Sequence, residues 1–277
     1  MTTKIEWTDE VWNPVTGCTK ISEGCTNCYA ERMTKRLAGR YGYPKNKPFG
    51  VTVHSDKLAQ PLLWKRPRRV FVCSMGDLFH DDVPGKFIGE MTEIMHTCKQ
   101  HTFILLTKRP ERMKSFFGNT LLMWGENIWI GVTAENQRQA DERIPILLQI
   151  PAAVRFVSVE PMLGEVGLSK YLDMAHVDGR DGINWVICGG ESGPGARPMH
   201  PDWVRSVRDQ CRAAAVPFFF KQWGEWVYPD QMPGETYQEV DANDNLGAHY
   251  NRAWKVGKKK AGRLLDGVEY SEYPQNL

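Results

Sequence analysis

The chain has 277 residues, of which 42% are hydrophobic, and its formal net charge is +2. This length and composition allow a sizeable buried core and exclude a largely disordered protein, while the near-neutral charge does not identify a polyanionic partner. No apolar run approaches the ~18 residues of a membrane span and the first residues lack a signal-peptide core, so we expect a cytoplasmic protein.

The N-terminal third predicts one strand, one loop, one helix and an insertion. Residues 10–18 (EVWNPVTGC) predict a short strand that runs directly into a cysteine loop at residues 17–29. Residues 29–40 (YAERMTKRLAGR) predict the first helix. Residues 41–69 are rich in Pro, Gly and basic residues, which is typical of an insertion between regular elements.

From residue 68 onward, strand-like and helix-like segments alternate. Two segments carry apolar residues at helical spacing, residues 83–99 and residues 200–215. The strand-like runs are rich in β-branched and aromatic residues and recur at the length of one β-loop-α unit. These runs are 68–74, 101–107, 127–133, 153–159, 184–190 and 217–223.

Such nearly continuous apolar strands predict a parallel sheet that is covered on both faces. Six or seven β-α units fit either a doubly wound open sheet or a barrel, complete or partial, and spacing alone does not decide between them. We expect one α/β domain at residues 1–223. The alternation stops near residue 224, and residues 224–277 predict an irregular appendage that packs on or near this domain.

Three of the seven cysteines lie within eleven residues, in the stretch GCTKISEGCTNCYAER. Cys18, Cys25 and Cys28 have the pattern C-x6-C-x2-C, whereas the other four cysteines stand singly in apolar surroundings typical of reduced core thiols. A structural zinc site uses four protein ligands, and a second cysteine pair is absent. Three cysteines can instead hold a [4Fe–4S] cluster and leave one iron open for chemistry.

The same stretch resembles the radical S-adenosylmethionine (SAM) superfamily, in which three cysteines follow the first strand of a full or partial TIM-like barrel. Together with VICGGESGPGARPM, FFFKQWGEW and GKKKAGRLLDG, it resembles more narrowly a radical-SAM-like family of unassigned function from phage and bacterial genomes. The resemblance implies a parallel β/α barrel and an enzyme in which Cys18, Cys25 and Cys28 each bind one iron. The cluster would cleave SAM to a 5′-deoxyadenosyl radical that abstracts a hydrogen from the substrate.

Two features of the cysteine loop depart from the usual superfamily pattern. The usual spacing is C-x3-C-x2-C, so the first gap is longer here. The residue before the last cysteine, usually aromatic, is Asn27, and an aromatic residue, Tyr29, follows that cysteine instead. Tyr29 is therefore a candidate contact for SAM.

Ligands of such sheets collect at the C-terminal ends of the strands, where this chain is polar and rich in glycine. Glu160 ends an apolar strand, and a carboxylate there needs a partner or a ligand. Asp77 occupies the place of the superfamily's glycine-acid motif near the SAM amino group, although a helix-capping role explains it equally well. The expected cofactor contacts are Tyr29, Ser74, Gly76, Asp77, Thr133, Glu135, Glu160, Gly189, Gly190 and Glu191, and the expected substrate contacts are Lys108, Arg109, Lys221, Gln222 and Trp223.

Basic residues interleaved with aromatic ones suggest contact with a nucleic acid, although such runs are usually solvated surface. They lie in WKRPRRV and in the tail, at Lys65, Arg66, Arg68, Arg69, Arg252, Lys255, Lys258, Lys259, Lys260 and Arg263. We therefore expect a radical SAM enzyme that needs a reducing electron donor and acts on a nucleobase, nucleotide or nucleic acid. The alternatives are a non-catalytic nucleic-acid-binding module with a structural zinc and an iron–sulfur redox protein.

Overall fold

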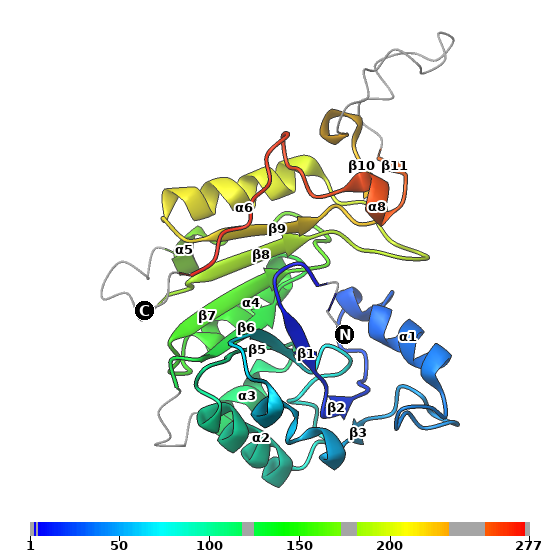
Figure 1. Ribbon diagram of the computed structural model, residues 1–277. Helices are drawn as coiled ribbons and strands as arrows, with labels where there is room; N and C mark the ends of the chain where they lie inside the picture. Colours follow the sequence, from blue (N-terminus) through cyan, green and yellow to red (C-terminus); the bar gives the residue numbers. More distant parts are fainter. Residues whose placement is uncertain (1–2, 4, 118–124, 173–181, 233–252, 275–277) are drawn as a thin grey trace.

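The computed structural model describes residues 3, 5–117, 125–172, 182–232 and 253–274. Seven parallel strands form one curled sheet with the order β1-β4-β5-β6-β7-β8-β9 (Figure 1). They are β1 (Glu10–Trp12), β4 (Arg69–Val72), β5 (Thr102–Thr107), β6 (Ile128–Thr133), β7 (Val154–Val159), β8 (Trp185–Gly189) and β9 (Phe218–Gln222).

The strand order settles the choice between the two architectures. Consecutive strands of the main sheet lie side by side from one edge to the other, so the order never reverses as it does in a doubly wound sheet. The sheet ends at β1 and β9 and is not closed. The fold is therefore a partial TIM-like β/α barrel.

Helices connect these strands and cover the convex face of the sheet (Figure 1). The helices expected at residues 83–99 and 200–215 form close to their expected ends because their apolar stripes are buried. In α2, for example, Phe87, Ile88, Met91 and Met95 are buried. The helices are α1 (Tyr29–Leu37), α2 (Gly85–Thr97), α3 (Pro110–Phe117), α4 (Gln137–Leu147), α5 (Ser169–Leu172) and α6 (Pro201–Ala213).

The predicted strand at residues 10–18 was wrong in its length. Only β1 joins the main sheet, and the chain breaks at Asn13 and Pro14 because proline cannot donate a ladder hydrogen bond. The short strand β2 (Val15–Thr16) then pairs with the strand β3 (Thr52–Val53), which belongs to the expected insertion. That insertion also contains the short 3₁₀ helices η2 (Ser55–Lys57) and η3 (Gln60–Leu63).

Side-chain alternation along the strands separates two apolar clusters. The larger cluster packs between the sheet and the helices. The smaller one fills the concave face and is largely aromatic, with Trp7 inserted from the N-terminal segment. Its buried members are Trp7, Phe71, Ile104, Trp129, Val154, Phe156, Trp185, Ile187 and Phe219. The concave face is thus closed by rings over part of its length.

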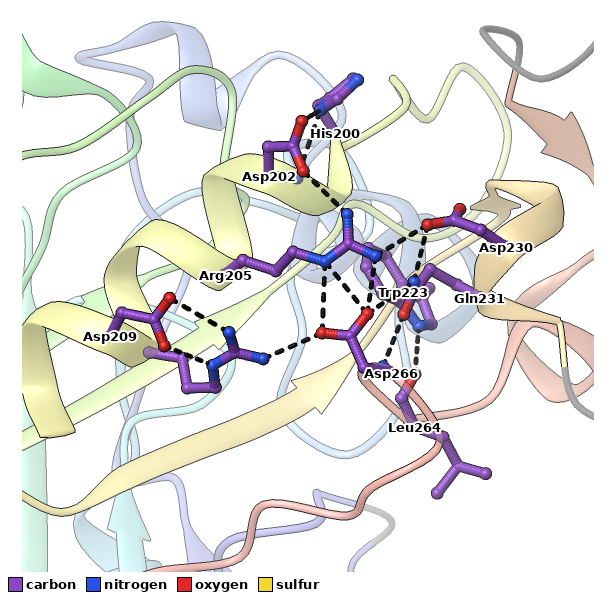
Figure 2. A network of polar contacts seen from close by, with 10 residues as sticks. His200, Asp202, Arg205, Asp209, Trp223, Asp230, Gln231, Leu264 and Asp266 are labelled. Carbon is purple, nitrogen blue, oxygen red and sulfur yellow. Dashed lines mark hydrogen bonds and ion pairs between the residues drawn. The ribbon is translucent and has the colours of Figure 1, made fainter.

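The segment after β9 packs back onto the sheet. The strand β10 (Trp226–Val227) pairs with the strand β11 (Trp254–Lys255). The short helices η5 (Pro229–Gln231) and α8 (Lys258–Ala261) lie near this pair. Asp266 binds Arg205 and Arg208 of α6, which ties the C-terminal segment to the convex side (Figure 2). Tyr273 packs its ring on Trp185 with centroids 5.4 Å apart. No helix of the described residues is long and apolar enough to cross a membrane.

Candidate active site at the carboxyl edge of the sheet

A cavity with a volume of ≈ 370 Å³ lies where the C-terminal ends of the strands meet the cysteine loop. Its size falls within the range of pockets that hold small-molecule ligands. All three cysteines of the loop line it, together with Tyr29, Ser74, Gly76, Asp77, Lys108, Arg109, Thr133, Glu160, Gly190, Glu191, Lys221 and Gln222. The topology therefore brings most of the expected site residues together in one wall.

The parallel topology explains why residues so distant in sequence meet here. On β6 and β7 the ring-bearing positions Trp129 and Phe156 are followed, two residues on, by Gly131 and Ser158 on the same face. Gly131 has no side chain because a Cβ there would lie 2.6 Å from the Phe156 ring. The concave face thus changes from aromatic to polar toward the C-terminal ends of its strands.

The cysteine loop begins at Gly17, whose φ of +84° suits glycine. A Cβ on Gly17 would lie 2.2 Å from the Gly50 carbonyl oxygen, so the loop starts in close contact with the insertion. All three cysteines of the loop are partly exposed and outside disulfides, whereas Cys73, Cys98, Cys188 and Cys211 are buried as expected for core thiols.

Arg109 connects the first cysteine to the sheet. Its guanidinium donates hydrogen bonds to Cys18 Sγ at 3.3 Å, to Asp77 Oδ2 at 2.9 Å and to the Thr19 carbonyl oxygen at 3.1 Å. Burial raises the pKa of the Cys18 thiol to about 11, and the Asp77 carboxylate acts in the same direction against Arg109. A metal that binds Cys18 must therefore displace a proton.

Glu135 anchors the middle of the loop from behind the cavity wall. Its fully buried carboxylate accepts hydrogen bonds from Ser22 Oγ at 2.5 Å and from Arg143 Nη1 at 2.7 Å, and Lys108 Nζ lies 3.2 Å away. Burial alone would raise the pKa of Glu135, but Lys108, Arg143 and Ser22 outweigh it and lower that pKa. The carboxylate therefore stays charged and holds Ser22, three residues before Cys25.

Glu191 anchors the end of the loop in the same way. Its carboxylate accepts two hydrogen bonds from the Arg197 guanidinium at 3.0 and 2.8 Å and one from Asn27 Nδ2 at 3.0 Å. Burial acts to raise the pKa of Glu191, and the hydrogen bonds from Arg197 and Asn27 lower it. Arg197 also donates to the Glu23 carbonyl oxygen, so β8 and the cysteine loop are joined through one arginine.

Two further contacts involve residues that line the cavity. Glu160 Oε1 accepts a hydrogen bond from Lys221 Nζ at 2.6 Å, and both side chains are about one-fifth exposed to the cavity. The Tyr29 hydroxyl donates to the Ser74 carbonyl oxygen, which fixes the start of α1 against the end of β4. The Glu160–Lys221 pair is thus a charged pair that faces the cavity.

Three expected site residues do not line the cavity: Glu135, Gly189 and Trp223. Glu135 serves the loop instead. Trp223 is buried in the larger apolar cluster, and its indole N–H donates to the Leu264 carbonyl oxygen (Figure 2). Gly190 lines the cavity, but its lack of a side chain has another cause, since a Cβ would lie 1.9 Å from the Trp223 carbonyl oxygen.

Several wall and anchoring residues were missed by sequence reasoning. Ser22, Arg143 and Arg197 carry no local signal of their role, because each is recognisable only through a partner far along the chain. Glu6 and Trp7 line the cavity from the N-terminal segment, where Glu6 forms an ion pair with Lys258 at 2.9 Å. The sequence IEW just before β1 was the only available hint.

Two of the basic residues expected to contact a nucleic acid are engaged in ion pairs. Arg68 pairs with Glu10 at 2.5 Å and Arg69 with Asp9 at 3.0 Å, so both belong to ion pairs at the edge of the sheet. Lys258 faces the cavity from α8. Arg252 lies outside the described residues.

The donor set of the loop is three thiols, and a structural zinc would need a fourth protein ligand. Among the described residues, no group of three or more His, Cys, Asp or Glu side chains is placed to hold one metal ion. In a cubane cluster, each cysteine binds a different iron, so the thiols need not converge on one point. Three free, partly exposed thiols in the wall of one cavity meet that requirement.

The amino-acid sequence assigns the chain to a protein family. A family model described as "Protein of unknown function (DUF5131)" matches residues 2–274. The chain belongs to the DUF5131 family. No curated protein matches it.

Among solved structures, the DUF5131 chain is similar to spore photoproduct lyase. The complex with dinucleoside spore photoproduct has 10% identity and a TM-score of 0.39, with 72% of this chain and 60% of that chain covered. A variant with bound AdoMet and dinucleoside spore photoproduct has 11% identity and a TM-score of 0.40, with 72% of this chain and 60% of that chain covered. A second variant has 12% identity and a TM-score of 0.42, with 76% of this chain and 64% of that chain covered. The chain thus spans less than two thirds of the length of these lyases.

Proposed function

We propose that this DUF5131 protein is a radical SAM enzyme that holds a [4Fe–4S] cluster through Cys18, Cys25 and Cys28. The observation that carries the proposal is the placement of all three thiols in one cavity wall, at the C-terminal edge of a partial β/α barrel. Polar ends of six other strands complete that wall. A structural zinc or a plain redox centre needs no such cavity.

Cys18, Cys25 and Cys28 would hold the cluster, which would supply one electron, taken from a reducing donor, for the cleavage of SAM to methionine and a 5′-deoxyadenosyl radical. The protein's own task is to orient SAM and keep water from the radical. Glu160 and Lys221 suit the ammonium and carboxylate groups of methionine, because an ion pair can exchange for a zwitterion without a change in net buried charge. Asp77 is already engaged by Arg109 and Thr107, so it acts through Arg109 on the cysteine loop.

The cavity wall offers further cofactor contacts that agree with this assignment. Thr133, Ser74, Gly76 and Gly190 present small or hydroxylated groups at neighbouring strand ends. Tyr29 reaches the same wall from the residue after the last cysteine. We assign these residues to SAM and leave Gln222 and Lys108 for the substrate, which we propose to be a nucleobase, nucleotide or nucleic acid.

Cysteine variants test the ligand assignment. Replacement of Cys18, Cys25 or Cys28 by Ala removes one iron ligand, so anaerobic reconstitution should yield less than stoichiometric iron and no 5′-deoxyadenosine from SAM. Cys98→Ala is the matched control, because Cys98 is a buried thiol outside the cavity. Wild-type iron content in any of the three loop variants would refute the assignment.

A further inference from the structure

The helix α1 and the first half of the insertion carry a large share of the chain's positive charge. Residues 32–55 contain six Lys and Arg residues and no Asp or Glu, so their formal charge is +6 in a chain of +2. The rest of the chain is therefore net acidic. The six cations, which we call the basic arm, are Arg32, Lys35, Arg36, Arg40, Lys45 and Lys47.

Most of the basic arm has no acidic partner. Arg32 donates to two backbone carbonyl oxygens, and Lys35 lies 3.8 Å from a glutamate of the same helix. The other four side chains are exposed and form no ion pair with any described residue: Arg36, Arg40, Lys45 and Lys47. Such cations are free to neutralise the phosphates of a nucleic acid.

An aromatic side chain projects from the middle of the basic arm. Tyr41 is 78% exposed and has a φ of +52°, a left-handed conformation that is strained for a bulky residue. The turn around it is closed by two hydrogen bonds of 2.9 Å, from Gly39 N–H to the Tyr43 carbonyl oxygen and from Tyr43 N–H to the Arg40 carbonyl oxygen. Tyr43 is buried, with its ring 6.1 Å from that of His54. The fold thus holds a turn that presents one ring to solvent among exposed cations.

The basic arm adjoins the cavity at both of its ends. α1 begins at Tyr29, which lines the cavity. Two residues after the arm, the Phe49 carbonyl oxygen accepts a hydrogen bond from Cys18 N–H at 3.2 Å, and Phe49 lines the cavity as well. α1 lies at the periphery of the molecule, apart from the helices of the convex face (Figure 1). It has nine residues and is about 13 Å long, which matches about four nucleotides at a rise of about 3.4 Å each.

We propose that the basic arm binds the backbone of a single-stranded nucleic acid, with Tyr41 stacked on an unpaired base, and leads the strand to the cavity. The charge of the arm selects a polyanion. The exposed ring favours a nucleic acid over an acidic protein, because single strands are held by cations along their backbone and by aromatic side chains on their bases. The inference rests on the proposed function for its link to catalysis, but binding itself requires neither the cluster nor SAM.

The experiment is a titration of a fluorescently labelled oligothymidylate with the full chain, followed by fluorescence anisotropy at several salt concentrations. The logarithm of the affinity for a single strand falls with the logarithm of salt concentration, with a slope of about −0.7 for each neutralised phosphate. We expect the triple variant Arg36→Gln, Arg40→Gln, Lys45→Gln to bind more weakly and to reduce the steepness of this slope by about 2.

A second triple variant is the matched control. It replaces by Gln three exposed cations on other elements, Lys86, Lys99 and Arg212. The net charge changes by the same amount, so an unchanged salt slope would show that the position of the charges matters. All replaced side chains are exposed, so both triple variants should keep the Tm of the unmodified protein.

The stacking contact is tested separately at Tyr41. Tyr41→Ala should weaken binding of the oligothymidylate about tenfold, whereas Tyr41→Phe keeps the ring and should bind as the unmodified protein does. An unchanged Kd in Tyr41→Ala, or an unchanged salt slope in the first triple variant, would overturn the inference. So would displacement of the strand by poly-L-glutamate as effective as by unlabelled oligothymidylate, because the arm would then fit an acidic protein.

The outcome also separates this inference from the proposed function. Binding of the strand that depends on the basic arm, in a protein that assembles no cluster, would support the arm and contradict the radical mechanism. SAM cleavage by a protein that binds no single strand would do the reverse.

Discussion

A methyl group added at Gly24 should dislodge the cysteine loop. A Cβ at this position would lie 2.4 Å from both Cγ and Oε1 of Glu135, which is 1.0 Å inside the 3.4 Å limit of ordinary contact. Glu135 cannot easily withdraw, because Arg143, Lys108 and Ser22 hold its carboxylate. Overpacking of this kind costs about 1–3 kcal/mol, which shifts the population of the docked loop by about 5- to 150-fold.

The assay for Gly24→Ala is iron content per chain after anaerobic reconstitution, together with the Tm of the unreconstituted protein. We expect a clear loss of iron and a small fall in Tm, because the clash is confined to the loop. Gly89→Ala is the matched control, since no atom lies within 4 Å of its Cβ and the residue is in α2. That variant should gain about 0.5–1 kcal/mol of stability and bind iron normally. Wild-type iron content in Gly24→Ala would refute the packing of the loop on Glu135.

Two other variants probe the charges around the fold. Arg109→Met removes a hydrogen bond to Cys18 Sγ, so the reduction potential of the reconstituted cluster should become more negative by about 60 mV. Lys114→Met, in the last turn of α3, should not change it. Equal potentials of Arg109→Met and the unmodified protein in a redox titration would contradict the contact. Arg205 lowers the pKa of Asp266 to about 2, against burial, so this carboxylate stabilises the fold above pH 4 and ceases to do so as the pH falls toward 2. Asp266→Asn should therefore lower the free energy of unfolding by about 1 kcal/mol at pH 7, a value discounted because the Asp266 side chain is 35% exposed. In urea titrations at pH 2 the same variant should lose no stability. A loss of stability that is independent of pH would exclude the charge as its cause.

The strands of the sheet were predictable because each is a buried run of β-branched and aromatic residues. All six strands expected after residue 68 occur within two residues of their expected ends. The strand at 10–18 was too long because its apolar residues continue past Pro14, whose effect on pairing outweighs its neighbours' propensity. The choice between barrel and doubly wound sheet required strand order, which local sequence does not contain.

The gathering of the expected residues at one edge of the sheet was predictable, but their contacts were not. Polar residues after consecutive parallel strands must meet at one edge, and Glu160, Lys221 and Glu191 do line the same cavity. It could not show that Glu135 turns away to hold Ser22, 113 residues earlier in the chain. Nor could it reveal Trp7, because this residue reaches the cavity from the segment before β1 and not from the end of a strand.

The central claim is that one iron of the cluster stays open for SAM. Electron paramagnetic resonance of the reconstituted, reduced protein, with and without SAM, tests it most directly. The account predicts a [4Fe–4S]⁺ signal that changes when SAM is added. A stoichiometric zinc content, or a cluster signal that is identical with and without SAM, would contradict it.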